Sequence, residues 1–166
     1  YRMKYVFVFL LLGLTSVVNA QTETAKQPDC DVLDGVQIDD IERAFEGGRF
    51  VPDDYTGIVF GCKHGKVKSL YNYKDGELDG LHRGWRYDGQ LWYEYNYKDG
   101  EYDGLWREWY ENGQLKVEAN YKDGKDDGLW REWYENGQLE MEANYKDGEL
   151  ISSKCWDTDL EEIECD

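Results

Sequence analysis

Carboxylates and aromatic rings are the side chains of this sequence that could carry chemistry. The 166 residues include 36 Asp and Glu, 14 Tyr and 7 Trp. Two carboxylates at a fixed separation can hydrolyse a glycosidic bond, but here the acids recur at a constant interval. A group that returns in every unit is more simply a turn former or part of a solvated strand. The sequence therefore predicts no catalytic residues, and a carboxylate-pair hydrolase is the least favoured function. The recurring acids are Asp75, Asp99, Asp123 and Asp147; Asp79, Asp103 and Asp127; and Glu94, Glu118 and Glu142.

Metal and cofactor sites lack the spacing that they need. The run from Asp75 to Gly80 mimics the first half of an EF-hand loop, but Arg86 stands where the last calcium ligand should be Glu. No Cys-x-x-Cys pair supports zinc, and His64 and His82 are too few to build a catalytic triad. No phosphate-binding loop occurs. We therefore expect no cofactor and no metal.

The net charge of −17 argues against two classes of partner. Nucleic acid and anionic lipid both need a basic surface. We expect no nucleic-acid binding and no binding to anionic membranes, and the expected partner is another protein.

The start of the chain and its four cysteines indicate export. Residues 1–20 read as a signal peptide, with Arg2 and Lys4 before an apolar run and small residues before a cleavage point at Gln21. We expect the mature chain to be periplasmic or secreted. An even number of cysteines in an exported chain predicts disulfides. Among the three possible pairings we favour the local one, Cys30 with Cys62 and Cys155 with Cys165.

A repeat of 24 residues organises the middle of the chain. Units start at Tyr73, Tyr97 and Tyr121, and the pattern restarts at Tyr145. Each unit contains Asn-Gly or Asp-Gly pairs, which signal hairpin turns, and the runs between them are too short and too rich in Trp, Tyr and Gly for helices. The sequence predicts an all-β fold, an elongated single-layer antiparallel meander of 24-residue β-hairpin repeats, that is, an open sheet or solenoid.

The flanks of the repeat set the expected organisation. Residues 21–31 are polar and are expected to form a flexible leader. Ile38, Ile41 and Phe45 have helical spacing, and a strand packed on the first repeat is an equal alternative. The expected segments are a signal peptide (1–20), an N-terminal leader and cap (21–55), the repeats (56–150, with a degenerate copy at 56–72 and full units at 73–96, 97–120 and 121–144) and a C-terminal cap (151–166).

The turn at Asn112-Gly113 decides which side chains share a face of the sheet. A two-residue turn pairs Tyr110 with Leu115, whereas a three-residue loop with a left-handed Gly113 pairs Trp109 with Leu115. The Trp109 position is Trp in every unit and the Trp106 position is not. We therefore favour the three-residue loop.

This choice predicts a structural face and a binding face. Leu105 and Trp109 should lie beside Val117 and Ala119 on the more apolar face, away from Trp106. The predicted structural residues are Trp85, Trp109, Trp133, Leu105, Leu129, Gly113 and Gly137. The predicted binding surface comprises Trp106, Tyr110, Trp130, Tyr134, Glu108 and Glu132.

The unit GLWREWYENGQLKVEANYKDGK strongly resembles the MORN-repeat variant of bacterial YwqK-type antitoxins. The resemblance covers about residues 57–156 and implies a β-hairpin array with a binding or scaffolding role. It also implies an antitoxin label for many members. The matching residues, which recur 24 residues later, are Gly104, Leu105, Trp106, Trp109, Tyr110, Asn112-Gly113, Leu115, Glu118, Tyr121 and Asp123-Gly124.

The sequence thus leads to two expected functions. The first is a non-catalytic, exported protein-binding scaffold of antitoxin or immunity type. The alternative is a carbohydrate-binding module, in which rows of Trp and Tyr stack on sugars and carboxylates bind their hydroxyls.

Overall fold

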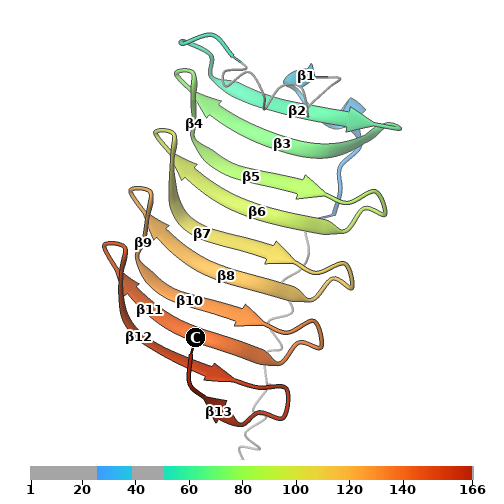
Figure 1. The fold of residues 1–166 in the computed structure, drawn as a ribbon. Helices are drawn as coiled ribbons and strands as arrows, with labels where there is room; N and C mark the ends of the chain where they lie inside the picture. Colours follow the sequence, from blue (N-terminus) through green and yellow to red (C-terminus); the bar gives the residue numbers. More distant parts are fainter. Residues whose placement is uncertain (1–25, 39–50, 166) are drawn as a thin grey trace, which may run out of the picture.

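The structure, a computed structural model, describes residues 26–38 and 51–165, and all strands in this part of the chain belong to one sheet (Figure 1). Each hairpin pairs with the next, so the predicted all-β meander of hairpin repeats is confirmed. The elements are a 3-10 turn, η1 (Cys30–Val32), and the strands β1 (Val36–Ile38), β2 (Gly57–Lys63), β3 (Lys66–Lys74), β4 (Glu77–Leu78), β5 (Gly80–Trp85), β6 (Leu91–Lys98), β7 (Glu101–Trp109), β8 (Leu115–Lys122), β9 (Lys125–Asp126), β10 (Gly128–Trp133), β11 (Leu139–Lys146), β12 (Glu149–Trp156) and β13 (Glu162–Ile163).

The first pair of strands departs from the predicted antiparallel order, because β1 lies parallel to β2, with Val36 opposite Val59. A short strand that enters from a separate N-terminal segment is not bound by a hairpin and is free to take either direction. Residues 36–38 are therefore a strand. The predicted signal peptide (1–20) and the alternative helix at Ile41 and Phe45 lie outside the described residues.

The Asp-Gly pairs that begin at Asp75, Asp99, Asp123 and Asp147 form two-residue turns at one end of the hairpins. Asp99 and Gly100 both have positive φ, 48° and 82°, as do the equivalent pairs in the other units. Two consecutive left-handed residues define the type I′ turn, for which Asp-Gly is a preferred sequence. The recurring acids at these positions are therefore turn formers.

The Asn-Gly pairs form the predicted three-residue loops at the other end. Gly113 has φ +83°, and the Tyr110 N–H donates to the Gln114 carbonyl at 2.9 Å. Trp109 lies opposite Leu115, as predicted.

A β-bulge just inside each loop corrects the predicted faces. Glu108 lies opposite Val117 although its neighbour Trp109 lies opposite Leu115, so Lys116 is an extra residue on β8. An inserted residue reverses the side-chain alternation beyond it. Val117 and Ala119 therefore share a face with Trp106 rather than with Leu105, contrary to the sequence-based expectation.

Leu105 and Leu129 accordingly sit in a polar setting on the opposite face. They lie opposite Asn120 and Asn144, and both leucines are half-buried. The Asn120 amide also donates to the Leu129 carbonyl at 3.0 Å. This Asn recurs in each unit, and it bridges the irregular pairing that follows the Asp-Gly turns.

Two small hydrophobic clusters form the core near the N-terminal end of the sheet. Trp85 and Trp109 are 5% and 3% exposed and belong to one cluster on the face opposite Trp106, where Leu115 packs against it. Trp133 is only half-buried. The other members of this cluster are Phe60, Val67 and Leu91; the second cluster contains Val51, Val59 and Tyr71.

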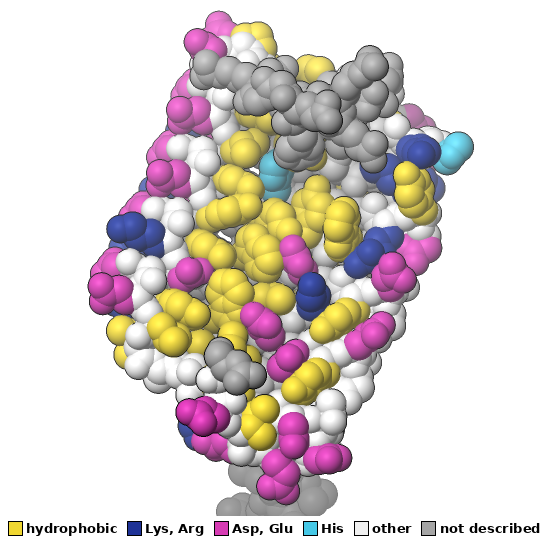
Figure 2. Space-filling model, viewed as in Figure 1, with side chains coloured by type: hydrophobic (Ala, Val, Ile, Leu, Met, Phe, Trp, Pro, Cys, Tyr) yellow, Lys and Arg dark blue, Asp and Glu magenta, His cyan; other side chains and the backbone are white. Residues whose placement is uncertain are grey.

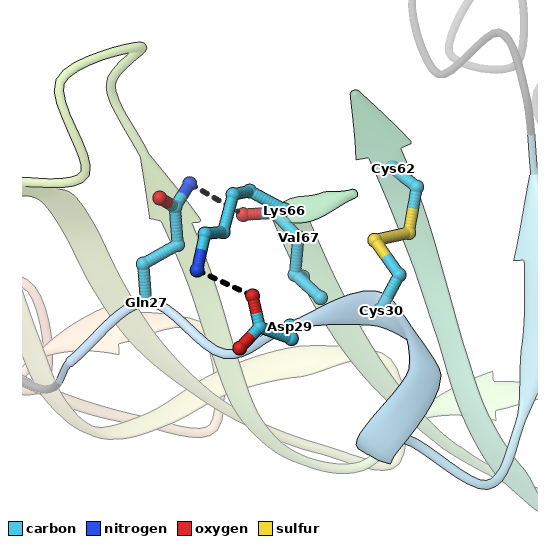
Figure 3. The surroundings of a disulfide bond; sticks show 6 residues. All are labelled: Gln27, Asp29, Cys30, Cys62, Lys66 and Val67. Atoms are coloured by element: carbon cyan, nitrogen blue, oxygen red, sulfur yellow. Dashed lines mark hydrogen bonds and ion pairs between the residues drawn. A yellow bond between two sulfur atoms is a disulfide. The ribbon is translucent and has the colours of Figure 1, made fainter. Parts of the chain in front are cut away.

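The N-terminal segment closes this core and is attached, which corrects the predicted flexible leader for its described part (Figure 3). Gln27 donates to the Val67 carbonyl at 2.8 Å, and Asp29 forms an ion pair with Lys66. Both predicted disulfides are present: Cys30–Cys62 ties this segment to β2, and Cys155–Cys165 ties the C-terminus to β12. Among the described residues, no helix is long and apolar enough to cross a membrane.

Candidate functional site

One face of the sheet carries a continuous row of aromatic rings, which we call the aromatic face. Because β-strand side chains alternate, every second residue of successive strands meets its cross-strand neighbour there. Figure 2 shows hydrophobic side chains gathered in a band across the strands, with acidic side chains along its left margin. The ring-bearing residues are Tyr71, His82, Tyr93, Tyr95, Tyr97, Tyr102, Trp106, Tyr121, Trp130 and Tyr145.

The rings pack on one another along the array. Tyr95 and Trp106 stack with centroids 4.9 Å apart and planes 7° apart. Trp106 and Trp130 follow at 6.3 Å and 21°. Ala119 lies on β8, between β7 with Trp106 and β10 with Trp130, and it is fully buried. A small residue at this position leaves room for the two indoles to approach each other above the sheet. Each ring is therefore half-buried by the neighbouring rings and not by a second layer of the protein.

Carboxylates line the aromatic face on the side of the Asn-Gly loops. Glu108 accepts a hydrogen bond from the Tyr95 hydroxyl at 2.7 Å, and Glu132 accepts one from the Trp130 indole at 2.8 Å. Burial raises the pKa of Tyr95, and the bond with Glu108 raises this pKa further. The tyrosines therefore stay neutral donors, and the face combines rings with negative charge.

Tyr110 and Tyr134, two of the predicted binding residues, have a different setting. The Tyr110 hydroxyl donates to the Trp133 carbonyl at 2.8 Å, and the Tyr134 hydroxyl donates to the Trp156 carbonyl at 2.9 Å. Each ties its loop to the next repeat. The structure thus brings together Trp106, Trp130, Glu108 and Glu132 of the predicted binding surface and places the two tyrosines at the joints between units.

His82 is a member of the aromatic face that the sequence did not identify as buried. It is 5% exposed and lies edge-on between Tyr71, at 4.1 Å, and Tyr97, at 4.9 Å. Burial lowers its pKa from 6.5 to about 3, so the imidazole is neutral at physiological pH. The sequence signal for its burial was its position in the repeat, which is occupied by Trp in the next two units.

The opposite face carries a ladder of ion pairs that sequence reasoning also missed. Arg107 bonds Glu118 at 2.7 Å and approaches Glu94 of the preceding strand to 3.7 Å. The same pair recurs as Arg83–Glu94 and Arg131–Glu142. Partly exposed pairs of this kind add little stability each, but they pair strand charges internally. The opposite face therefore presents charges that are already paired, and the aromatic face is the stronger candidate for a binding surface.

The titratable groups of the aromatic face are held in their neutral forms, which suit non-covalent contacts. Across the described residues, no group of three or more His, Cys, Asp or Glu side chains is placed to hold a metal ion. The groups with displaced pKa values on the aromatic face are buried tyrosines and His82, all held in their neutral forms. Such rings offer stacking, hydrogen bonds and apolar contact area.

One protein-family model matches the repeated part of the chain. The MORN repeat variant family matches the chain in three copies, at residues 78–99, 102–123 and 126–147. The matched segments cover the hairpins that carry the aromatic face. No match to a curated protein was found.

Proposed function

We propose that this chain is a non-catalytic repeat scaffold that binds another protein through its aromatic face. One observation carries the proposal: a contiguous row of half-buried Trp and Tyr rings crosses the strands with no second layer over β7–β11 among the described residues. Exposed aromatic patches with a polar rim mark interaction surfaces, and Trp and Tyr are frequent hot-spot residues in interfaces.

The proposed setting is outside the cytoplasm, and the proposed type is an antitoxin- or immunity-like binder. Two disulfides are compatible with an extracytoplasmic location, and the signal-like residues 1–20 support export. A scaffold built from repeats, with its hairpins in one layer, presents a long surface without needing a catalytic centre.

The ring geometry favours a protein over a sugar as the ligand. A pyranose stacks on the open face of an aromatic ring, but the faces of Tyr95 and Trp106 lie against each other. The accessible parts are ring edges with Glu108 and Glu132 beside them. Edges and carboxylates suit contacts with side chains and backbone of a protein surface better than stacking on a sugar ring.

The chain supplies its own substitutions for a test. Trp106→His copies the residue of the preceding unit, His82, so the fold accommodates it. Tyr87, 75% exposed in a loop away from the aromatic face, is the control, as Tyr87→Glu copies the loop residue of later units. Each protein, with its disulfides oxidised, is incubated as bait with a periplasmic or secreted fraction of the source cells. Bound proteins are then chemically cross-linked to the bait.

We expect one protein to be captured by the wild type and by Tyr87→Glu, and to be lost with a Trp106→His, Trp130→Ser double variant whose unfolding curve shows that it is folded. If every captured protein is recovered equally with the double variant, the aromatic face is not the binding surface. If a glycan panel binds the wild type and not the double variant, the ligand is a carbohydrate and the proposal is wrong.

A further inference from the structure

The strand β12, at the C-terminal end of the sheet, has an outer edge that is largely unpaired in the described part of the chain (Figure 1). The short strand β13 pairs only with Cys155 and Trp156. Residues 149–154 pair with β11 on their inner side, and no strand within residues 26–38 and 51–165 pairs with their outer side. The opposite end of the sheet differs, because β1 pairs with the outer side of β2. We call residues 149–154 the open edge.

The repeat shows which backbone contacts the open edge lacks. The Gly124 N–H donates to the Tyr102 carbonyl at 2.9 Å, and the Gly148 N–H donates to the Asp126 carbonyl at 2.9 Å. Each of these bonds joins one unit to the turn of the next. Leu150 holds the position of Tyr102 and Asp126 in β12, two residues after the Asp-Gly turn. Among the described residues no further turn follows, so the Leu150 carbonyl lacks the donor that its equivalents have.

Exposed aliphatic side chains accompany these backbone groups. Leu150 is 53% exposed and Ile151 is 65% exposed. The strand has eight residues and no proline, and its protection against pairing is limited to a bulge at Ile151 and one lysine, Lys154. A long edge with unpaired backbone groups and exposed aliphatic residues is a template for a further strand.

The two ends of the open edge carry opposite charges on the same face of the sheet. Glu149 lies opposite Lys146 of β11. Lys154 lies opposite Glu142, which shares the face of Lys146 because strand side chains alternate and an even step separates the two. In a regular strand, Glu149 and Lys154 would point to opposite faces. The bulge at Ile151 adds one residue and brings them to the same one.

A second copy of the same edge matches this pattern. Antiparallel pairing about a two-fold axis at the middle of the open edge places Glu149 of each copy opposite Lys154 of the other. It also places Leu150 opposite Ser153. Directly opposed side chains must share a face, and both pairs do: Leu150 and Ser153 belong to the aromatic face, since their partners on β11 belong to it.

We propose that two copies of this chain pair through the open edge of β12 to form a dimer with one continuous sheet. The proposal goes beyond the proposed function and does not depend on it. A two-fold axis perpendicular to the sheet keeps the aromatic faces of both copies on the same side. The dimer therefore presents two aromatic faces to one side.

The same pairing extends the ladder of ion pairs on the opposite face. Arg107 lies between glutamates of the preceding and following strands. Lys154 holds the equivalent position in β12, with Glu142 of β11 on its inner side. The second copy supplies Glu149 on its outer side. Lys154 also bonds Glu162 of β13 at 3.3 Å, but both side chains are 60% exposed, so Lys154 stays accessible.

Sedimentation of the oxidised chain over a range of concentrations tests the proposal. A joint of six residues is small for an interface, and each copy carries −17. We therefore expect a reversible dimer whose fraction rises with protein concentration. The ionic strength is held constant, at a value that screens the net repulsion between the copies.

Two charge variants test the predicted contact. Glu149→Lys and Lys154→Glu each place like charges opposite each other at both symmetry-related contacts, which is unfavourable across paired strands. Each should raise the dissociation constant of the dimer about tenfold or more. Glu111→Lys makes the same charge change as Glu149→Lys on a loop side chain that is 89% exposed, and it should dimerise at least as well as the wild type.

A mixture of the two charge variants provides the decisive comparison. In a mixed dimer, positions 149 and 154 again carry opposite charges at both contacts. The mixture should therefore dimerise as well as the wild type although each variant alone does not. This recovery also shows that both variants are folded, because a misfolded edge cannot be restored by mixing.

A wild-type chain that sediments as a monomer at every concentration overturns the proposal. So does a dimer that persists unchanged in both charge variants, a dimer that is equally weakened by Glu111→Lys, or a mixture that stays monomeric. If the wild type is monomeric and a protein captured from the source cells is lost with Glu149→Lys, a strand of that partner occupies the open edge instead of a second copy. The double variant of the aromatic face keeps this edge and should still dimerise, so the two proposals fail independently.

Discussion

Trp109 and Trp133 occupy equivalent positions in the repeat but differ in burial. Trp109 is 3% exposed within the core cluster, whereas Trp133 is half-buried. We expect Trp109→Ala to cost about 3–5 kcal/mol of unfolding free energy, because it leaves a cavity in a packed cluster, and Trp133→Ala to cost clearly less. Urea unfolding measures both values. Equal losses would mean that the cluster extends to the C-terminal units.

His82 makes stability depend on pH. Its pKa is lowered from 6.5 to about 3 by burial, so the unfolded chain takes up a proton below pH 6.5 that the folded chain refuses until about pH 3. Stability therefore falls as the pH drops through this window. Between pH 7 and pH 5 we expect a loss of about 2 kcal/mol from this residue.

The control for this pH dependence is His82→Trp, which copies Trp106. The unfolding free energy of the wild type minus that of the variant should fall by about 2 kcal/mol from pH 7 to pH 5, because only the wild type carries His82. The carboxyl groups are the same in both proteins, so their contributions cancel in this difference. The pKa values of Asp29 and Asp127 are lowered from 3.8, so these groups act below the interval from pH 7 to pH 5 in which the two proteins are compared. A pH-independent difference would show that His82 is solvated.

At the scale of the hairpin, the glycine of the Asn-Gly loop has a left-handed backbone. Gly113 has φ +83°, and its nearest neighbours stand 3.8 Å or more from an added Cβ, so the backbone rather than space restricts substitution. We expect Gly113→Val to destabilise by about 1–3 kcal/mol, because a β-branched residue is strained at positive φ. Lys116→Val on the adjacent strand serves as the control in denaturant unfolding.

The hairpins were predictable from sequence because turn chemistry is local. The Asn-Gly and Asp-Gly pairs specify their loops, and constant Trp109 selected the right pairing with Leu115. The bulge was not predictable: its extra residue is Trp92, Lys116 or Glu140 in different units, which share no chemical property. Missing one inserted residue misplaced Val117 and Ala119 and hid the fact that small residues lie beneath the ring row.

The candidate site was partly predictable for the same reason. Trp106 and Trp130 were predicted to lie on the binding face because they recur at the same position of the repeat, and the structure places them together. Tyr110 and Tyr134 share their periodicity, yet their hydroxyls bond backbone carbonyls of the next unit. Periodicity alone does not separate a residue that contacts a partner from one that contacts the neighbouring repeat.

For the whole molecule, the two disulfides close opposite ends of the sheet. Cys30–Cys62 spans 32 residues and Cys155–Cys165 spans 10. In the chain-entropy description, removing the first by Cys→Ser pairs should cost about 4 kcal/mol and the second about 3 kcal/mol. The unfolding midpoints of the two double variants show which disulfide contributes more stability.

Thiol labelling of the denatured wild type should find no free thiol, and two or more reactive thiols would contradict the pairing.

The repeat also predicts how the molecule tolerates the loss of a unit. Deleting residues 97–120 joins Asn96 to Tyr121 and keeps the period, so Trp133 and Leu139 inherit the positions of Trp109 and Leu115. In a linear array each unit contacts only its neighbours, so the shortened chain should fold with both disulfides and lower stability.

Deleting residues 97–119, one residue fewer, is the matched control. The odd residue shifts the pairing and moves every side chain of the following strand to the other face, which places ring residues among the Arg–Glu pairs. Near-UV circular dichroism and urea unfolding distinguish the outcomes: the 24-residue deletion should retain a cooperative transition and the 23-residue deletion should lose it. Cooperative unfolding of both would mean that the joints between repeats, rather than the period, determine the register.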